Sequence, residues 1–126
     1  MDETLLYTSE RKQFQSPLNE FQLVQAKLAD MYTNLQATRC MVYQIATAFA
    51  EGIKSNMDSS SVYLQASRVA VSNADECIQL FGGNGYINEY PCGRFWRDAK
   101  LYDIGGGTKE IRQWLIGREL NKIYKQ

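Results

Sequence analysis

The stretch from Pro17 to Gly52 most constrains the fold, because its apolar residues recur at alternating steps of three and four. This spacing places them on one face of a helix and is kept for about four heptads. A helix of this length is roughly 45 to 50 Å long. The predicted face consists of Phe21, Val24, Leu28, Met31, Leu35, Thr38, Val42, Ile45 and Phe49.

A second stripe of apolar and aromatic residues runs along a neighbouring face of the same predicted helix. So broad an apolar surface needs more than one neighbouring helix to cover it. The pattern therefore predicts packing in a bundle or oligomerisation. The second stripe consists of Ala29, Tyr32, Gln36, Tyr43, Ala46 and Ala50.

Two further helices are predicted on either side of the long one. Residues Asp2 to Phe14 are expected to form a short helix, which Ser16 and Pro17 end. Its apolar face is thin and consists of Leu5, Leu6 and Tyr7. After a turn at Gly52 to Met57, Asp58 to Ser61 offer N-cap side chains for a helix that runs to Phe81. Along this helix lies a stripe of small residues that permits close helix packing, Ala66, Ala70 and Ala74.

The last third of the chain is punctuated by glycines. Gly82 and Gly83 are expected to stop the preceding helix. Irregular chain follows up to Gly107, with a short helix around Gly93 to Tyr102 after Pro91. A final helix begins near Thr108, whose hydroxyl can cap it, and runs to about Tyr124. Its predicted inward face is Ile111, Leu115, Ile116, Leu120 and Ile123, widened by Trp114.

Composition bounds the possible functions. The 126 residues, of which 44% are hydrophobic, suffice for one domain with a core. Fourteen basic and fourteen acidic residues cancel, so no net charge points to nucleic acid or to an anionic membrane. No apolar run reaches the roughly 18 residues of a membrane span. Acidic residues after Met1 do not resemble a signal sequence, and a removed upstream transit peptide is left open.

The chain has no histidine, which excludes Ser-His-Asp and Cys-His chemistry. Cys40, Cys77 and Cys92 are widely spaced and odd in number, and without histidine they complete no zinc set, so no metal site is expected. They are predicted to be reduced, packed thiols of an intracellular protein. Any acid or base would have to be a carboxylate, lysine, tyrosine or cysteine.

Two glycine clusters each allow two interpretations. Taken alone, Gln79 to Gly85 favours a helix C-cap followed by a turn. Gly105 to Thr108 is equally a flexible lead-in to a helix or an anion or carbonyl site, because a helix N-terminus carries about half a positive charge. Lys109 and Arg112 in the first turn oppose the helix dipole, which mildly favours a negative ligand nearby.

For several charged and aromatic residues, a structural role is a simpler interpretation than a functional one. Arg97, Asp98 and Lys100 are expected to form a structural ion pair rather than a catalytic cluster. On composition, Arg11 is a solvated cation at a helix end more readily than a phosphate ligand. Trp96, Trp114 and the tyrosines are predicted to be core or interface aromatics.

Several motifs occur in a specific order over nearly the whole chain. They are S-E-R-K-Q-F near Arg11, E-F-Q at 20–22, L-A-D-M-Y at 28–32, Q-L-F-G-G-N-G-Y at 79–86, R-D-A-K at 97–100 and I-G-G-G-T before K-E-I-R-Q. In this order they resemble the C-terminal helical domain of the flavin-dependent acyl-CoA dehydrogenases. The segment from Gly93 to Glu110 is most similar to the isovaleryl branch of that family.

The resemblance implies an all-α fold, an up-down four-helix bundle in which residues 1–126 form a single C-terminal domain. The family's N-terminal helical domain and middle β-domain are missing from these residues. The implied activity of the parent enzyme is removal of hydrogens from Cα and Cβ of a short branched acyl-CoA such as isovaleryl-CoA. A glutamate takes the α-proton, FAD accepts the β-hydride and an electron-transfer flavoprotein reoxidises it.

The family's FAD lies between subunits, so the resemblance implies a homo-oligomer, a dimer or tetramer. The implied location is the mitochondrial matrix, or the cytoplasm if the source is bacterial, with no nucleic-acid or membrane partner. By carry-over, FAD would be contacted by Arg11, Gln22, Gln79, Leu80, Phe81, Gly82, Gly83, Thr108 and Glu110, with the segment from Gln79 to Gly83 reaching across the interface. Gly106 and Gly107 would border the substrate thioester, and the Gly106 N–H would polarise its carbonyl. The two glycine-rich helix boundaries are thus expected to meet one nucleotide cofactor that is held between copies of the helical bundle.

The chain departs from the family pattern at two positions. Gln15 stands where glycine is usual in R-K-x-F-G, which leaves open the turn after the first helix. Gly106 stands where many relatives carry the catalytic glutamate, so the base is expected on a helix outside these residues. No catalytic residue is therefore assigned, and the isolated chain is expected to be inactive. The alternative is a stand-alone helical oligomerisation module without flavin.

Overall fold

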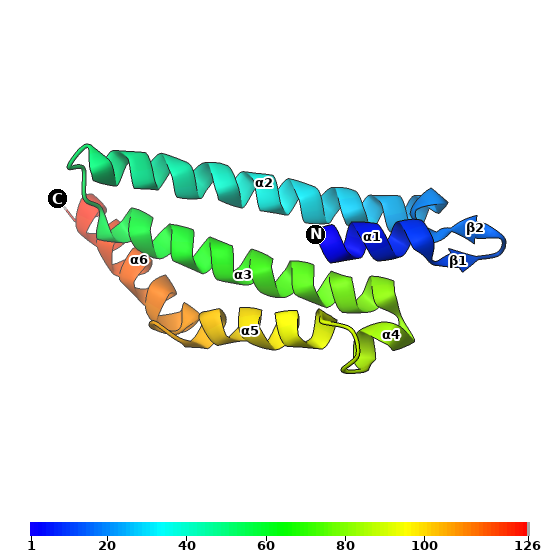
Figure 1. The fold of residues 1–126 in the computed structure, drawn as a ribbon. Helices are drawn as coiled ribbons and strands as arrows, with labels where there is room; N and C mark the ends of the chain where they lie inside the picture. Colours follow the sequence, from blue (N-terminus) through cyan, green and yellow to red (C-terminus); the bar gives the residue numbers. More distant parts are fainter. Residues whose placement is uncertain (126) are drawn as a thin grey trace.

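The fold is organised around α3, Asn56–Phe81, which contacts α2, Gln22–Ala50, α5, Cys92–Ile104, and α6, Lys109–Tyr124. The structure is a computed structural model that describes residues 1–125. The short helix α1, Asp2–Glu10, packs against α3. Chain direction alternates through α1, α2, α3 and α5, and α6 continues from α5 across the first half of α3 (Figure 1). The predicted all-α, up-down bundle is therefore confirmed.

The chain turns back on itself where the first helix was expected to continue. Strand β1, Lys12–Gln13, pairs antiparallel with β2, Ser16–Pro17, and a short 3-10 helix, Leu18–Glu20, follows. The two residues between the strands, Phe14 and Gln15, have φ of 50° and 69°. Two-residue hairpin loops need such positive φ values because they match the twist of the strands. The prediction of a helix to Phe14 is wrong, since α1 ends at Glu10.

The buried face of α1 also differs from the predicted one. Leu5 and Leu6 are exposed, whereas Thr4 and Thr8 are fully buried. The Thr8 hydroxyl donates to the Thr4 carbonyl at 2.8 Å, which satisfies this polar group within the helix. Only Tyr7 of the predicted apolar face packs against the core.

Most of the predicted first face of α2 lies inward, with Met31 in the centre of the core. The helix begins at Gln22 rather than Pro17, because the hairpin and the 3-10 helix occupy the residues before it. Tyr32 and Tyr43, from the second stripe, are 56% and 65% exposed. The chain's own helices therefore leave this aromatic face open.

The third helix ends where the sequence predicted and begins slightly earlier. Its N-cap is Ser55, whose hydroxyl accepts from the Asp58 N–H at 3.1 Å, so the predicted cap at Asp58 to Ser61 is wrong. Phe81 is its last residue, and Gly82 follows with a φ of 59°. Ser55 escaped notice because it lies within the predicted turn.

The last third contains more helix than predicted. Gly83–Tyr86 forms the short helix α4, and α5 is longer than the expected segment at both ends. The predicted cap of α6 is confirmed, because the Thr108 hydroxyl accepts from the Ile111 N–H at 3.4 Å. Ile111, Leu120, Ile123 and Trp114, expected to face inward, are exposed. No helix within residues 1–125 is long and apolar enough to cross a membrane.

The positive φ of Gln15 in the hairpin loop allows a prediction about stability. Replacing Gln15 with glycine should raise the free energy of unfolding by about 0.5 to 1 kcal/mol, because a side chain disfavours the positive φ at this position. Chemical denaturation measures the change. Lys12→Gly, at an exposed strand position with ordinary backbone geometry, is the matched control and should destabilise slightly. A loss of stability in Gln15→Gly would contradict the strain argument.

Candidate functional site

An aromatic cluster joins the end of α3 to α1 and to the segment before α5. The ring of Tyr7 stacks on that of Phe81, with centroids 3.9 Å apart and planes at 12°, and the Tyr7 hydroxyl donates to the Phe81 carbonyl at 3.3 Å. Tyr90 packs edge-on against both rings, at 5.9 and 5.5 Å. Aromatic pairs in these geometries add to the stabilisation from burial alone. The cluster therefore fixes the C-terminal end of α3 against the start of the chain.

This packing places Arg11 beside the segment from Gln79 to Gly83. Together they line an open groove of about 320 Å³, hereafter the Arg11 groove. The Leu18 N–H donates to the Arg11 carbonyl at 2.9 Å and holds the backbone at the groove's edge. Gln22, at the start of α2, is exposed and is not among the residues that line the groove. The groove is lined by Tyr7, Arg11, Gln13, Leu18, Gln79, Leu80, Phe81, Gly82, Gly83 and Asn84.

The glycines next to this groove serve different purposes. A Cβ added at Gly82 or Gly83 would meet nothing within 4 Å, so the backbone there is open. A Cβ added at Gly85 would lie 2.9 Å from the Ile78 Cα and closer still to the Ile78 carbonyl oxygen. Gly85 thus allows α4 to pack on α3, while Gly82 and Gly83 present accessible backbone. The Asn84 side chain contributes by donating to the Tyr7 hydroxyl at 2.9 Å.

The second glycine cluster forms the loop between α5 and α6, hereafter the Gly106 loop, residues 105–108. Gly106 and Gly107 have φ of 65° and 95°. The Tyr63 hydroxyl of α3 donates to the Gly105 carbonyl at 2.7 Å. Arg112 donates to the Gly106 carbonyl, and its guanidinium lies 4.6 Å from the Tyr63 ring centroid. Two side chains therefore anchor the carbonyls of this loop and leave Gly106 exposed.

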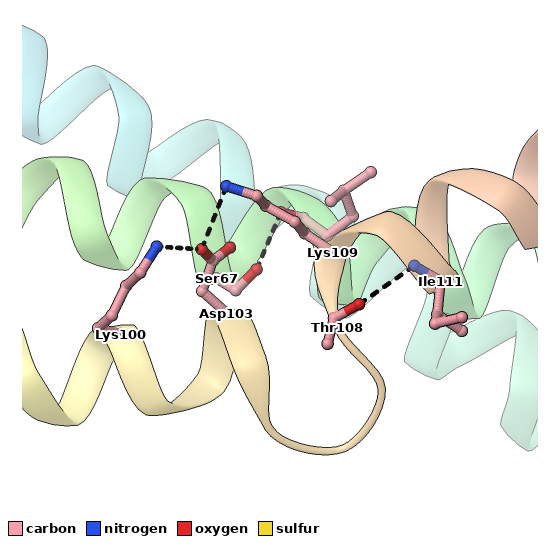
Figure 2. Close-up of polar contacts among 7 residues, drawn as sticks. Ser67, Lys100, Asp103, Thr108, Lys109 and Ile111 are labelled. Carbon is pink, nitrogen blue, oxygen red and sulfur yellow. Dashed lines mark hydrogen bonds and ion pairs between the residues drawn. The ribbon is translucent and has the colours of Figure 1, made fainter.

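Asp103 ties the end of α5 to the start of α6. Its buried carboxylate lies 2.6 Å from the Lys100 Nζ and 3.7 Å from the Lys109 Nζ (Figure 2). The hydrogen bond from Lys100, with the charges of both lysines, holds the pKa of Asp103 below its usual value even though burial opposes this. The expected pairing of Arg97 with Asp98 is wrong, since both are exposed and the ion pairs formed by α5 within residues 1–125 are those of Asp103.

The cations at the start of α6 have partners within the chain. Lys109 lies near Asp103, and Arg112 contacts the Gly106 loop and Tyr63. Their unfavourable position on the helix dipole therefore does not require a bound anion. Thr108 is committed to capping α6, and Glu110 is exposed in its first turn.

The two glycine-rich boundaries lie at opposite ends of α3 (Figure 1). Tyr63 contacts the Gly106 loop, and Phe81 lines the Arg11 groove. The helical stretch between them is about 27 Å long. The two boundaries therefore do not face each other within one chain, and the expectation that they meet one cofactor held between copies stays a prediction. The candidates divide into a groove set, Arg11 with Gln79 to Gly83, and a loop set, Gly106, Gly107, Thr108 and Glu110.

Several residues that shape these regions were missed by the sequence analysis. Tyr7, Asn84 and Tyr63 act through contacts between helices that are distant in sequence, and no local pattern marks them. Asp103 could have been found, because it follows Lys100 by three residues and such pairs meet on one helix face. Within residues 1–125 no group of acidic, cysteine or histidine side chains could hold a metal ion.

Comparisons with known proteins agree with the fold and with the motifs. The family described as "Acyl-CoA dehydrogenase, C-terminal domain" matches residues 1–121. A mitochondrial isovaleryl-CoA dehydrogenase from Solanum tuberosum is 51% identical over 97% of this chain and 30% of its own length. A mitochondrial 2-methylacyl-CoA dehydrogenase from the same plant is 52% identical over the same shares. This chain therefore spans about a third of the length of these relatives.

A solved structure supports the same assignment. Butyryl-CoA dehydrogenase from Megasphaera elsdenii superposes with a TM-score of 0.92 and is 38% identical. The match covers 95% of this chain and 31% of that one. The helical arrangement in Figure 1 is thus shared with a known enzyme over nearly the whole chain.

The ion pairs of Asp103 with Lys100 and Lys109 predict that stability depends on pH. Because folding lowers the pKa of Asp103, its contribution to stability is present above the unfolded value of about 3.9 and is lost as the pH falls through the folded value. Asp103→Asn should therefore lower the free energy of unfolding at pH 7 by roughly 1 to 2 kcal/mol. The difference from the unmodified chain should shrink as the pH falls below about 3.9. Asp98→Asn, at an exposed position on the same helix, should change little at either pH. Equal effects of the two substitutions at pH 7 would contradict the assignment.

Proposed function

The chain belongs to the acyl-CoA dehydrogenase family, whose C-terminal domain it forms, and on that premise we propose that it supplies two separate halves of an interfacial FAD site. The family consists of flavoprotein oxidoreductases. The observation that carries the proposal is the position of Arg11 in one groove with the segment from Gln79 to Gly83. These residues come from two distant parts of the sequence, and both belong to the set that the family resemblance assigns to FAD.

The chemistry of the Arg11 groove suits the pyrophosphate of a dinucleotide. Among the described residues, no carboxylate lies within ion-pair distance of Arg11, so its guanidinium is free to take an external anion. Guanidinium groups bind phosphate oxygens through two parallel hydrogen bonds. The open backbone at Gly82 and Gly83 lets a ligand approach without meeting a Cβ. The groove residues therefore fit this part of FAD.

The Gly106 loop would serve the substrate and the other part of the cofactor. Gly106 is exposed, and the anchored carbonyls of Gly105 and Gly106 fix the orientation of the backbone there. A Gly106 N–H held in this way would polarise a thioester carbonyl and make the neighbouring α-proton more acidic. Thr108, the N-cap of α6, and Glu110, in its first turn, would contact FAD from the same side.

The separation of the two sets requires more than one copy of the chain. A groove set and a loop set about 27 Å apart along α3 can meet one flavin only if different copies supply them. Arg11 then belongs to the contribution that reaches across the interface, together with the segment from Gln79 to Gly83. Exposed aromatic residues on α2 and α6, among them Tyr32, Tyr43 and Trp114, would supply contact surface for the dimer or tetramer.

The proposed parent reaction is the α,β-dehydrogenation of a short branched acyl-CoA such as isovaleryl-CoA. FAD, when bound, would accept the β-hydride, and an electron-transfer flavoprotein would be the physiological acceptor. Gly106 offers no carboxylate, so we assign the base to a part of the parent outside this chain and expect the chain alone to be inactive. The preference for isovaleryl-CoA rests on the motif resemblance, since relatives named for isovaleryl and 2-methylacyl substrates are almost equally identical.

The names of the relatives also bear on location. The Solanum tuberosum relatives are described as mitochondrial, and a Bacillus subtilis relative is a probable acyl-CoA dehydrogenase that is 40% identical. We therefore place the protein in the mitochondrial matrix, or in the cytoplasm of a bacterial source.

A second candidate is a helical oligomerisation module without flavin. It is favoured by the glycine at position 106 and by the separation of the two candidate sets along α3 within one chain. Flavin absorbance of the purified protein, read together with its mass by light scattering, separates the two. A colourless oligomer with no measurable affinity for FAD supports the module.

The FAD proposal predicts a specific loss in an Arg11 variant. Arg11→Ala should weaken FAD binding roughly tenfold or more, since charge-assisted hydrogen bonds contribute about 1.5 to 3 kcal/mol. Quenching of flavin fluorescence on titration measures the affinity, which we expect to be weak even in the unmodified chain. Lys12→Ala removes the adjacent exposed charge and should leave binding nearly unchanged. Equal losses in both variants would point to nonspecific attraction.

The assignment of the base is tested separately. Adding FAD and isovaleryl-CoA to the purified chain should cause no bleaching of the flavin absorbance. Robust turnover would contradict the missing-base argument while leaving the FAD site intact.

A further inference from the structure

Two buried thiols meet where the end of α3 packs against the start of α5. The Cys77 Sγ donates to the Cys92 Sγ at 3.5 Å, and both cysteines are free. Their relative exposures are 5% and 0%. They belong to the core cluster that also contains Leu80 and Phe81. A disulfide between them requires the two sulfurs to come closer than this.

We propose that Cys77 and Cys92 form a redox-sensitive pair that closes into an intramolecular disulfide on reaction with a peroxide. The proposal rests on the geometry of the thiols and of the cavity beside them. It does not depend on flavin binding, so it can be tested independently of the proposed function.

A cavity gives a small oxidant access to one thiol of the pair. About 670 Å³ of space lies between the start of α1 and helices α2, α3 and α5, and Cys77 lines it whereas Cys92 does not. Thr4 and Thr38 also line this cavity, and both are more than nine-tenths buried. Within residues 1–125 their hydroxyls have no hydrogen-bond partner. A peroxide is a small donor and acceptor that these hydroxyls could hold beside Cys77.

The order of the chemical steps follows from this placement. The Cys77 thiol gives up its proton, its sulfur attacks one oxygen of hydrogen peroxide, the O–O bond breaks, and the hydroxide that leaves takes that proton, so a sulfenic acid and one water form. The Cys92 sulfur then attacks the Cys77 sulfur, the S–O bond breaks, and the hydroxyl group leaves with the Cys92 proton as a second water. The two thiols lose two electrons and two protons, and the peroxide is reduced to two waters. Burial, reinforced by Cys77, raises the pKa of Cys92 to about 12, which keeps Cys92 a neutral thiol and disfavours it as the first sulfur to attack the peroxide.

The disulfide would enclose the segment that forms the Arg11 groove. The loop from Cys77 to Cys92 contains Gln79 to Gly83, the helix α4 and Tyr90. Oxidation would therefore restrict the movement of the groove relative to α5. Closing a loop of about fifteen residues also constrains the unfolded chain, so the thermal midpoint should rise by roughly 5 to 10 °C.

The test uses the full chain carrying Cys40→Ser, because Cys40 is exposed and could link two copies. The folded protein is treated with hydrogen peroxide, then denatured and alkylated, and its peptides are analysed by mass spectrometry. We expect both remaining thiols to resist alkylation, a peptide linking Cys77 to Cys92, and recovery of both thiols after reduction. The proposal is overturned if both thiols still alkylate, or if the link forms only when peroxide is added to denatured protein.

Two variants in the same background test the order of attack. With Cys92→Ser, dimedone should trap a sulfenic acid on Cys77. With Cys77→Ser, Cys92 should remain unmodified at the same peroxide dose, because it is fully buried and does not line the cavity. Circular dichroism checks that both variants fold. Faster oxidation of Cys92 than of Cys77 would overturn the proposed route.

Discussion

The length of α3 is the constraint on which the rest of the account depends. One end of this helix carries the Arg11 groove, and Tyr63, about two turns from its other end, anchors the Gly106 loop. A helix is rigid over this distance, so no adjustment of loops brings the two regions together in one chain. A cofactor that needs both regions must be shared between copies.

Packing at the C-terminal end of α3 determines the shape of the groove. The stack of Tyr7 on Phe81 positions the residues on either side of the groove, because Arg11 follows one ring by four residues and Gly82 directly follows the other. Gly85 allows α4 to lie against α3, and Asn84 completes the contact through the Tyr7 hydroxyl. These contacts position Gly82 and Gly83, where the space that a Cβ would occupy stays open.

Local signals in the sequence predicted those parts of the fold that local interactions determine. The end of α3 before Gly82 and the Thr108 cap of α6 are confirmed, since a glycine with positive φ and a capping hydroxyl act on adjacent residues. The hairpin was missed because Phe14 and Gln15 adopt positive φ without glycine, so its usual mark is absent. The buried threonines of α1 were missed because only the packing of that helix shows which side faces inward.

The candidate site was predicted as a set of residues but not as an arrangement. The motifs named Arg11 and Gln79 to Gly83 together, and the structure brings them into one groove. The order of the motifs in the sequence does not predict the distance from this groove to Gly106. That distance depends on the antiparallel packing of α5 on α3. For the same reason the clamp of Tyr63 and Arg112 on the Gly106 loop was not foreseen.

Complementation between copies tests the division of the site most directly. Copies carrying Arg11→Ala are co-assembled with copies carrying Thr108→Val, each of which should bind FAD poorly alone. If different copies supply the two halves, every mixed pair contains one intact site, and the mixture should regain part of the FAD binding of the unmodified chain. Binding by the mixture no better than the average of the two separate variants would show that each site is built within a single copy, and would contradict the account.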